Sequence, residues 1–187
     1  GIKQIAERIH GLSVFLSKAL ETLGYKQENK FFFDTLKLEL GDLINPIHAE
    51  ALNNEVNLNY EGSLVSITLD ETTTPGDVMT IIRFFAKVMG KNAHELDLDG
   101  IKSGISSHIP SNLQRKSAYL THPVFNSYHS EHEMLRYIKS LEAKDLSLCH
   151  SMIALGSCTM KLNATTEMVP VTWAEFSKIH PFAPADQ

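Results

Sequence analysis

The chain lacks the sequence features of disulfide-rich, zinc-binding, membrane-spanning and nucleic-acid-binding proteins. Its 187 residues include two cysteines, Cys149 and Cys158, which are too few for a disulfide framework and fit no zinc motif. No run of eighteen apolar residues occurs, so we expect no membrane partner. Basic residues are sparse, with 17 Lys and Arg against 22 Asp and Glu and a net charge of −5. Because nucleic-acid binding needs a basic face, we expect no nucleic-acid partner either.

Motifs of several enzyme classes are also missing. The chain has no Gly-x-Ser-x-Gly elbow and no glycine-rich loop of the dinucleotide-binding or P-loop kind. What remains is an ordinary composition, with 43% apolar and 21% charged residues. A chain of this length buries enough surface to fold without disulfides or metals. We therefore predict a soluble protein of a reducing compartment.

The first ninety residues carry the spacing patterns of both helices and strands. Apolar residues at intervals of three and four predict a helix ended by Gly24, whose stripe is Ile2, Ile5, Ile9, Leu12, Leu16, Leu20 and Leu23. The later elements are predicted as a strand over 31–40, a helix over 45–53 capped by Asn45, strands over 56–60 and 64–69, and a helix from Thr74-Pro75 to Gly90. This order predicts a small α/β domain over 1–90, with helices on one face of an antiparallel or mixed sheet.

Beyond residue 90 the patterns weaken. Glycines and serines predict a linker over 91–120 with one turn of helix. Ser130 and Glu133 form a capping box that opens a helix ending near Lys144, whose residues predicted to face inward are Met134, Leu135, Ile138 and Leu141. Residues 147–187 have little periodicity but carry aromatic residues. We interpret 121–187 as a helix followed by an extended arm that is ordered by contact with another domain.

The most unusual stretch is LGSCTMKLN, residues 155–163. A glycine followed by Ser157, Cys158 and Thr159 presents backbone N–H groups and hydroxyls that suit an anion, and Lys161 adds a positive charge or an amine nucleophile. A turn whose hydroxyls bond to its own backbone explains the same residues. The chemistry of the stretch alone does not separate these two interpretations.

Two weaker constellations have simpler explanations. His129 and His132 are three residues apart and suit a metal ion, but no third ligand has a fitting spacing, so we favour capping and surface roles and predict no metal site. Cys149 and Cys158 lack the spacing of a redox motif, so we favour neutral thiols.

Three dense motifs occur in order within the last 67 residues. They are THPVFNSYHSE from Thr121, LGSCTMKLN from Leu155, and TWAEF from Thr172 followed by IHPF from Ile179. Together they resemble the P-protein family of the glycine cleavage system. Upstream, GIKQIAERIH and KFFFDTLKLEL are similar to the end of that family's first half. The resemblance covers essentially the whole chain and marks it as an internal fragment.

The resemblance implies a pyridoxal-phosphate enzyme of fold type I that is built from two homologous halves. Residues 1–90 are similar to the small C-terminal domain of the first half, and 121–187 to the entry segment of the second. The implied reaction decarboxylates glycine and passes the aminomethyl group to the lipoyl arm of the H-protein. The family also implies self-association, as a dimer or an assembly of two half-chains, in the bacterial cytoplasm or the mitochondrial matrix.

The family's Schiff-base lysine lies in a His-Lys dipeptide, and this chain has none. We therefore expect no catalytic residue in the chain, no pyridoxal phosphate bound to it, and no activity of the chain alone. The resemblance places LGSCTMKLN at the active-site entrance, where the cofactor-binding or substrate-channel candidates are Ser157, Cys158, Thr159, Lys161 and Asn163. Residues 9–82 contain no arginine, and the first candidate for a carboxylate clamp is Arg83, for which a solvated surface charge is the simpler role, so we expect no obvious clamp on this domain. A non-catalytic binding or assembly module of the same family is the alternative.

Overall fold

The computed structural model describes residues 1–103, 109–145 and 164–187. The chain divides into two compact units, Gly1–Arg115 and Lys116–Gln187. Within the described residues, no helix combines the length and apolar character needed to cross a membrane.

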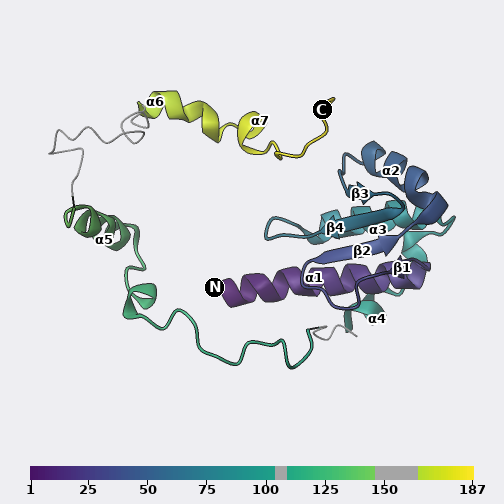
Figure 1. Cartoon of the computed structure of the whole chain (residues 1–187), viewed down its shortest axis with the longest axis horizontal. Helices are drawn as coiled ribbons and strands as arrows, with labels where there is room; N and C mark the ends of the chain where they lie inside the picture. Colours follow the sequence, from purple (N-terminus) through teal and green to yellow (C-terminus); the bar gives the residue numbers. More distant parts are fainter. Residues whose placement is uncertain (104–108, 146–163) are drawn as a thin grey trace. The chain divides into compact units, whose positions relative to one another are not determined.

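The first unit is built on a four-stranded antiparallel sheet (Figure 1). Its strands are β1 (Lys26–Gln27), β2 (Thr35–Glu39), β3 (Asn59–Glu61) and β4 (Leu64–Thr68), in the order β1-β2-β4-β3. The central pair sets Leu36 opposite Ile67 and Leu38 opposite Val65. All four of these side chains are buried, whereas the alternating residues are partly exposed, so one face of the sheet forms the core.

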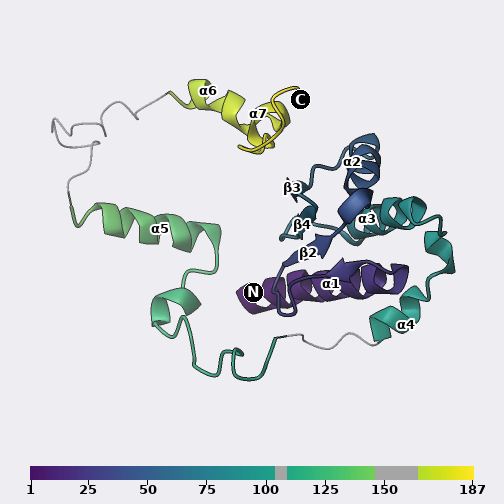
Figure 2. The same ribbon diagram turned by 45° about the vertical axis from the view of Figure 1, so that its right-hand side comes forward.

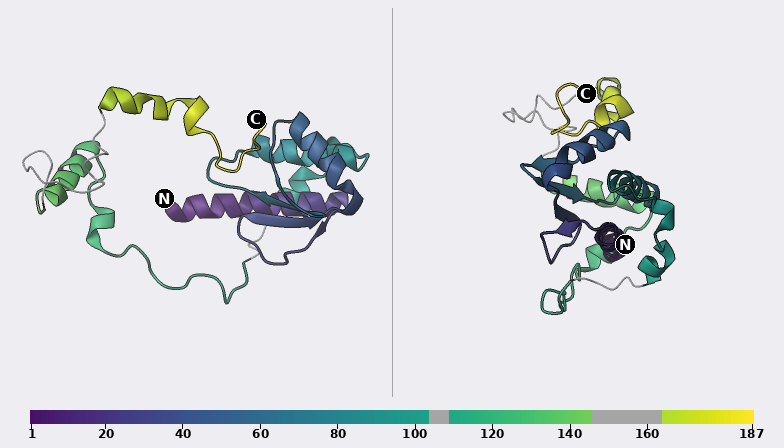
Figure 3. Two further views of the ribbon diagram at one scale, coloured as in Figure 1. Left: turned by 45° about the horizontal axis from the view of Figure 1, so that its top comes forward. Right: turned by 90° about the vertical axis from the view of Figure 1, so that its right-hand side faces the viewer.

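Three helices cover that face and share a single core with it. They are α1 (Ile2–Leu23), α2 (Ile44–Asn53) and α3 (Pro75–Val88), and α3 packs against both of the others. Figure 2 shows α1 and α3 side by side, and the right-hand view of Figure 3 shows the sheet on one side of them. The predicted class, helices on one face of a small sheet, is confirmed, and the sheet is antiparallel.

The helix ends follow the predicted local signals. Gly24 ends α1 with a φ of 102°, a left-handed conformation that glycine adopts without a Cβ clash. Thr74 caps α3: its hydroxyl accepts from the Asp77 N–H at 3.2 Å, and the Asp77 carboxylate accepts from the Thr74 N–H at 2.7 Å. Gly62, with a φ of 61°, lies in the predicted hairpin turn between β3 and β4.

Several details of the first unit differ from prediction. The strand predicted over 56–60 is the shorter β3, which begins at Asn59. The strand predicted over 31–40 begins only at Thr35, and the short β1 was not predicted. The helix predicted to be capped by Asn45 begins at Ile44, because the preceding 3₁₀ turn η1 (Gly41–Leu43) already bonds Leu43 N–H to Leu40 O at 2.9 Å. Ile2 and Ile5 of the α1 stripe are exposed, because α1 contributes buried residues only from Ile9 onward.

After α3 the chain continues through η2 (Ala93–Glu95) and α4 (Leu98–Ser103). Ala93 is buried, and Leu96 and Ile101 pack against the core of the unit. The part of 91–120 nearest α3 is therefore packed onto the first unit.

The described elements of the second unit are η3 (Pro123–Asn126), α5 (Glu131–Glu142), α6 (Thr165–Met168), η5 (Val169–Thr172) and α7 (Ala174–Ser177). The capping box predicted for α5 is present, with the Glu133 N–H donating to Ser130 Oγ at 3.3 Å. The prediction that its apolar residues face inward is wrong: Met134, Leu135, Ile138 and Leu141 are 44–56% exposed. The helical period shows which side of α5 is apolar, but it carries no information about what covers that side.

Candidate functional site

The residues predicted to line an active-site entrance lie outside the described part of the chain. This holds for all five: Ser157, Cys158, Thr159, Lys161 and Asn163. Cys149, which was considered with Cys158 as a redox pair, also lies outside the described residues. Their roles therefore stay predictions.

The motif from Thr121 to Glu131 is described, and it forms a compact turn ahead of α5. The His122 ring accepts the Val124 N–H at Nδ1, 3.2 Å away, which leaves its proton on Nε2. Ser127 Oγ donates to Pro123 O at 2.8 Å. Tyr128 has a φ of 53° and stacks on Tyr137 of α5, with ring centroids 4.3 Å apart and planes at 16°. These contacts shape the turn, and none of them positions a reactive group against another.

His129 and His132, which were considered as metal ligands, are exposed at the start of α5. Within the described residues, no group of three or more His, Cys, Asp or Glu side chains is placed to hold a metal ion. A pair of exposed histidines without a third ligand offers no closed coordination shell.

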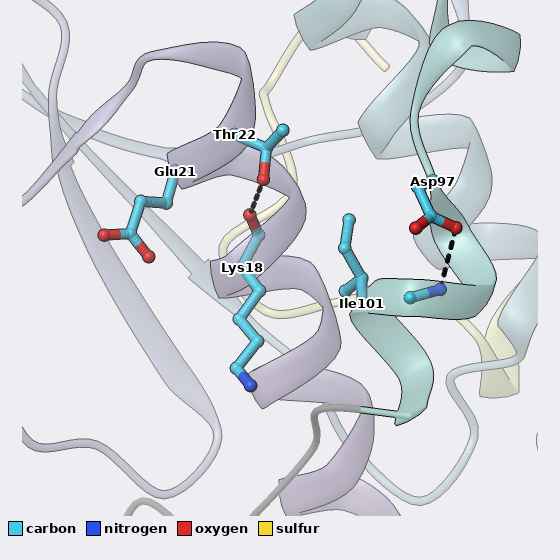
Figure 4. Close-up of a pocket in the computed structure, with 6 residues that line it drawn as sticks. Lys18, Glu21, Thr22, Asp97 and Ile101 are labelled. Carbon is cyan, nitrogen blue, oxygen red and sulfur yellow. Dashed lines mark hydrogen bonds between the residues drawn. The ribbon is translucent and has the colours of Figure 1, made fainter.

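An open groove of about 590 Å³ lies between α1 and the α4 segment. Figure 4 shows Lys18, Glu21 and Thr22 on one side, and Asp97 and Ile101 on the other. Thr22 Oγ1 donates to Lys18 O at 2.8 Å, and Asp97 Oδ1 accepts the Gly100 N–H at 2.8 Å. Both bonds serve the helices themselves. Sequence reasoning did not single out this groove, because its residues come from distant segments and belong to no motif.

A second groove, of about 480 Å³, runs along the start of β1. Its polar side chains bond to one another: Ser17 Oγ donates to Gln27 Oε1 at 2.6 Å, and Gln27 Nε2 donates to Asn29 O at 2.7 Å. These bonds fix the segment between α1 and β2. Lys26, which also lines the groove, is exposed and pairs with the Glu28 carboxylate at 2.7 Å.

Neither Arg8 nor Arg83 forms an anion clamp in either groove. Arg8 donates to two backbone oxygens, Thr73 O at 2.6 Å and Glu71 O at 3.3 Å, and so ties the loop before α3 to α1. Arg83, the clamp candidate from the sequence, is exposed on α3 and lines neither groove.

The resolved pKa shifts also have structural causes. Burial raises the pKa of Tyr25 and raises that of Tyr60 to about 12. Hydrogen bonds from Thr74 lower the pKa of Asp77, and bonds from Ser130 lower that of Glu133, at the two capping boxes. The lowered pKa values belong to carboxylates that cap helices and the raised ones follow from burial, so neither kind of shift marks a group poised for proton transfer. The described residues form a framework and hold no assembled catalytic centre.

Comparison with known proteins gives the family. The family model described as glycine cleavage system P-protein matches residues 1–85. The chain is 50% identical over 188 residues to glycine dehydrogenase (decarboxylating) of Cupriavidus metallidurans, and 49% identical over 189 residues to glycine dehydrogenase (decarboxylating) 1, mitochondrial, of Arabidopsis thaliana. Each match takes in 100% of this chain but only 19% and 18% of those proteins, so the chain spans about a fifth of their length. The chain belongs to the glycine cleavage system P-protein family.

Proposed function

We propose that this chain is part of an enzyme that decarboxylates glycine. The observation that carries the proposal is the identity of about 50% across the whole chain to two glycine dehydrogenases (decarboxylating), one from a bacterium and one from a plant. Both matches span the whole chain, including both units and LGSCTMKLN, so the similarity does not depend on a single motif. The compartments we propose are the bacterial cytoplasm or the mitochondrial matrix.

The cofactor we propose for the whole enzyme is pyridoxal phosphate, which accepts the electrons left behind when carbon dioxide departs. The described residues do not fit this group. The chain has no His-Lys dipeptide, and several lysines are already engaged: Lys87 Nζ lies 2.7 Å from a Glu50 carboxylate oxygen, and Lys91 Nζ donates to Leu23 O at 2.8 Å. We therefore propose that the cofactor is held by a part of the enzyme outside this chain, and that the chain alone is inactive.

Within the enzyme we assign the two units different roles. Residues 1–90 are the small fold-type I domain that ends the first half, and 121–187 are the entry segment of the second half. Ser157, Cys158, Thr159, Lys161 and Asn163 line the entrance to the active site. Their hydroxyl, amide and amine groups suit the carboxylate of glycine or the phosphate of the cofactor. The aminomethyl product passes to the lipoyl arm of the H-protein, and the enzyme assembles as a dimer or from two half-chains.

The test compares the 187-residue chain with the full-length enzyme, both supplied with pyridoxal phosphate and H-protein. Release of labelled carbon dioxide from carboxyl-labelled glycine is expected from the full-length enzyme only. Release by the chain alone, abolished by Lys161→Ala, would overturn the assignment of the cofactor. No release by the full-length enzyme would leave the binding or assembly module as the function.

The entrance assignment has its own test in the full-length enzyme. Ser157→Ala and Thr159→Ala are expected to lower kcat/KM for glycine by about tenfold, the effect of losing about 1.4 kcal/mol of interaction in the transition state. Ser140→Ala is the matched control, because Ser140 Oγ donates only to Tyr137 O in its own helix, at 2.7 Å. An unchanged kcat/KM in both entrance variants would mean that LGSCTMKLN is a structural turn and does not contact the substrate.

A further inference from the structure

The apolar face of α5, defined by Met134, Leu135, Ile138 and Leu141, lies open. These side chains are 46%, 56%, 53% and 44% exposed, and their spacing places them on one side of the helix. The opposite side carries the polar residues Arg136 and Ser140, and near the end of the helix Lys139 pairs with Glu142 at 2.7 Å. A helix with this division of side chains is built to bury one face against a partner.

The described part of the unit that contains α5 supplies no core to receive this face. None of its described residues, 116–145 and 164–187, is buried. The aromatic side chains nearer its end are open as well, with Trp173 52%, Phe176 60% and Phe182 88% exposed. By contrast, the first unit buries apolar residues from α1, α2, α3 and the sheet in one cluster.

The shortness of α5 is a second reason to expect a partner for its apolar face. The helix has 12 residues. Isolated helices shorter than roughly 12–15 residues are marginal in water, and in proteins most helical stability comes from packing of an apolar face. The capping box at Ser130 and Glu133 helps to start the helix, but it does not replace that packing.

We propose that the apolar face of α5 docks on the part of the P-protein polypeptide that lies outside this chain. The inference rests on the proposed function, because it takes the whole enzyme to be a P-protein. The relatives match this chain along all of its length yet extend to about five times that length, so most of their surface lies outside the matched region. A second copy of this chain fits less well: four half-exposed side chains offer on the order of a few hundred Å², below the roughly 800 Å² per partner of a stable interface.

Hydrogen exchange of the α5 amides tests the docking in the protein as it exists. In the full-length enzyme we expect these amides to exchange at least about tenfold more slowly than in the 187-residue chain, because docking suppresses local opening. In the full-length enzyme, Ile138→Lys is expected to restore fast exchange in α5. Ser140→Lys, which adds the same charge on the polar side, is expected to leave exchange slow.

Each other outcome overturns the proposal. Fast exchange in the full-length enzyme would mean that nothing covers the face. Slow exchange in the chain alone that grows with concentration would assign the face to a second copy, and slow exchange at every concentration would assign it to the chain itself. Glycine decarboxylation, measured on the same samples, separates the two proposals: turnover with fast exchange refutes only the docking, and slow exchange without turnover refutes only the proposed function.

Discussion

Removing the hydroxyl of Tyr60 should make the first unit more stable. Tyr60 lies on β3, with its ring centroid 4.7 Å from that of His48, and its hydroxyl oxygen is buried without a hydrogen-bond partner in the described part of the chain. A buried hydroxyl without a partner costs about 1–3 kcal/mol in lost hydration. Because the Tyr60 ring is only partly buried, we take the low end and expect Tyr60→Phe to raise the free energy of unfolding by about 1 kcal/mol.

Tyr25 provides the matched control, because the same atom is deleted from a satisfied site. Its buried hydroxyl donates to Phe85 O at 2.9 Å and so joins the end of α1 to α3. Tyr25→Phe is expected to lower the free energy of unfolding by about 1 kcal/mol, the worth of a typical hydrogen bond. The loss stays near that value because Phe85 O also accepts the Met89 N–H at 3.3 Å and keeps a partner.

Urea unfolding followed by far-ultraviolet circular dichroism measures both variants. Equal m-values show that the variants differ in stability and not in the surface exposed on unfolding. In thermal unfolding, about 1 kcal/mol corresponds to a shift in Tm of roughly 4 °C for a domain of this size. If Tyr60→Phe lowers stability as much as Tyr25→Phe does, the Tyr60 hydroxyl has a partner and the reasoning is refuted.

The pH dependence of Tyr60→Phe gives a second readout. The folded pKa of Tyr60, about 12, lies above its ordinary value of 10.0. As the pH rises above 10, the unfolded chain loses the phenolic proton while the folded chain keeps it, so the stability of the natural sequence falls. Tyr60→Phe lacks this contribution, so its advantage over the natural sequence is expected to grow between pH 10 and 12. A constant advantage across that range would contradict the burial of the hydroxyl.

Three further variants test the local signals of the first unit by urea unfolding. Thr74→Ala is expected to cost about 1 kcal/mol by removing the side-chain cap of α3. The backbone N–H and the hydroxyl of Thr74 hold the pKa of Asp77 below its ordinary value, so natural stability should fall as the pH drops through that lowered pKa; the variant keeps the backbone N–H and should lose only part of this dependence. Gly24→Ala is expected to cost about 1 kcal/mol, since its φ of 102° strains any residue with a Cβ; a neutral result would mean that the helix end shifts. Asn29→Ala is expected to cost about 1–2 kcal/mol, because its side chain bonds two backbone groups of β2, each at 2.8 Å; no change would show that water replaces both bonds.

The predictable parts of the fold are those that depend on residues close together in the sequence, such as helix caps and tight turns. Thr74 and Asp77 are three residues apart, so the start of α3 needs no distant partner. Gly62 makes the β3–β4 turn within its own hairpin. The element boundaries that were wrong depend on distant contacts: β1 has two residues and exists because Lys26 and Gln27 pair with Glu39 and Leu38 of β2. No periodicity exists in two residues, so a strand of that length follows only from the register of its partner.

The start of α2 shows a different limit of local reasoning. Asn45 before Pro46 is a strong capping signal, but Gly41, with a φ of 51°, turns the chain early and the helix begins at Ile44. The proline still occupies the first turn, where its missing N–H costs nothing. The residue that decided the boundary was therefore a glycine four positions upstream of the proposed cap.

The two units differ in what their apolar patterns achieve. In α1 the stripe from Ile9 onward is buried, with Leu12 partly so, because β2 and α3 of the same unit contact it. In α5 a comparable stripe is exposed, because the described residues of its own unit, 116–145 and 164–187, include no buried layer. Periodicity is a property of one segment, whereas burial is a property of two surfaces, so the same signal led to a correct prediction for α1 and a wrong one for α5. The motif LGSCTMKLN follows the same logic: its groups suit an anion or a turn, and only a second surface that presents the anion makes the first of these a function.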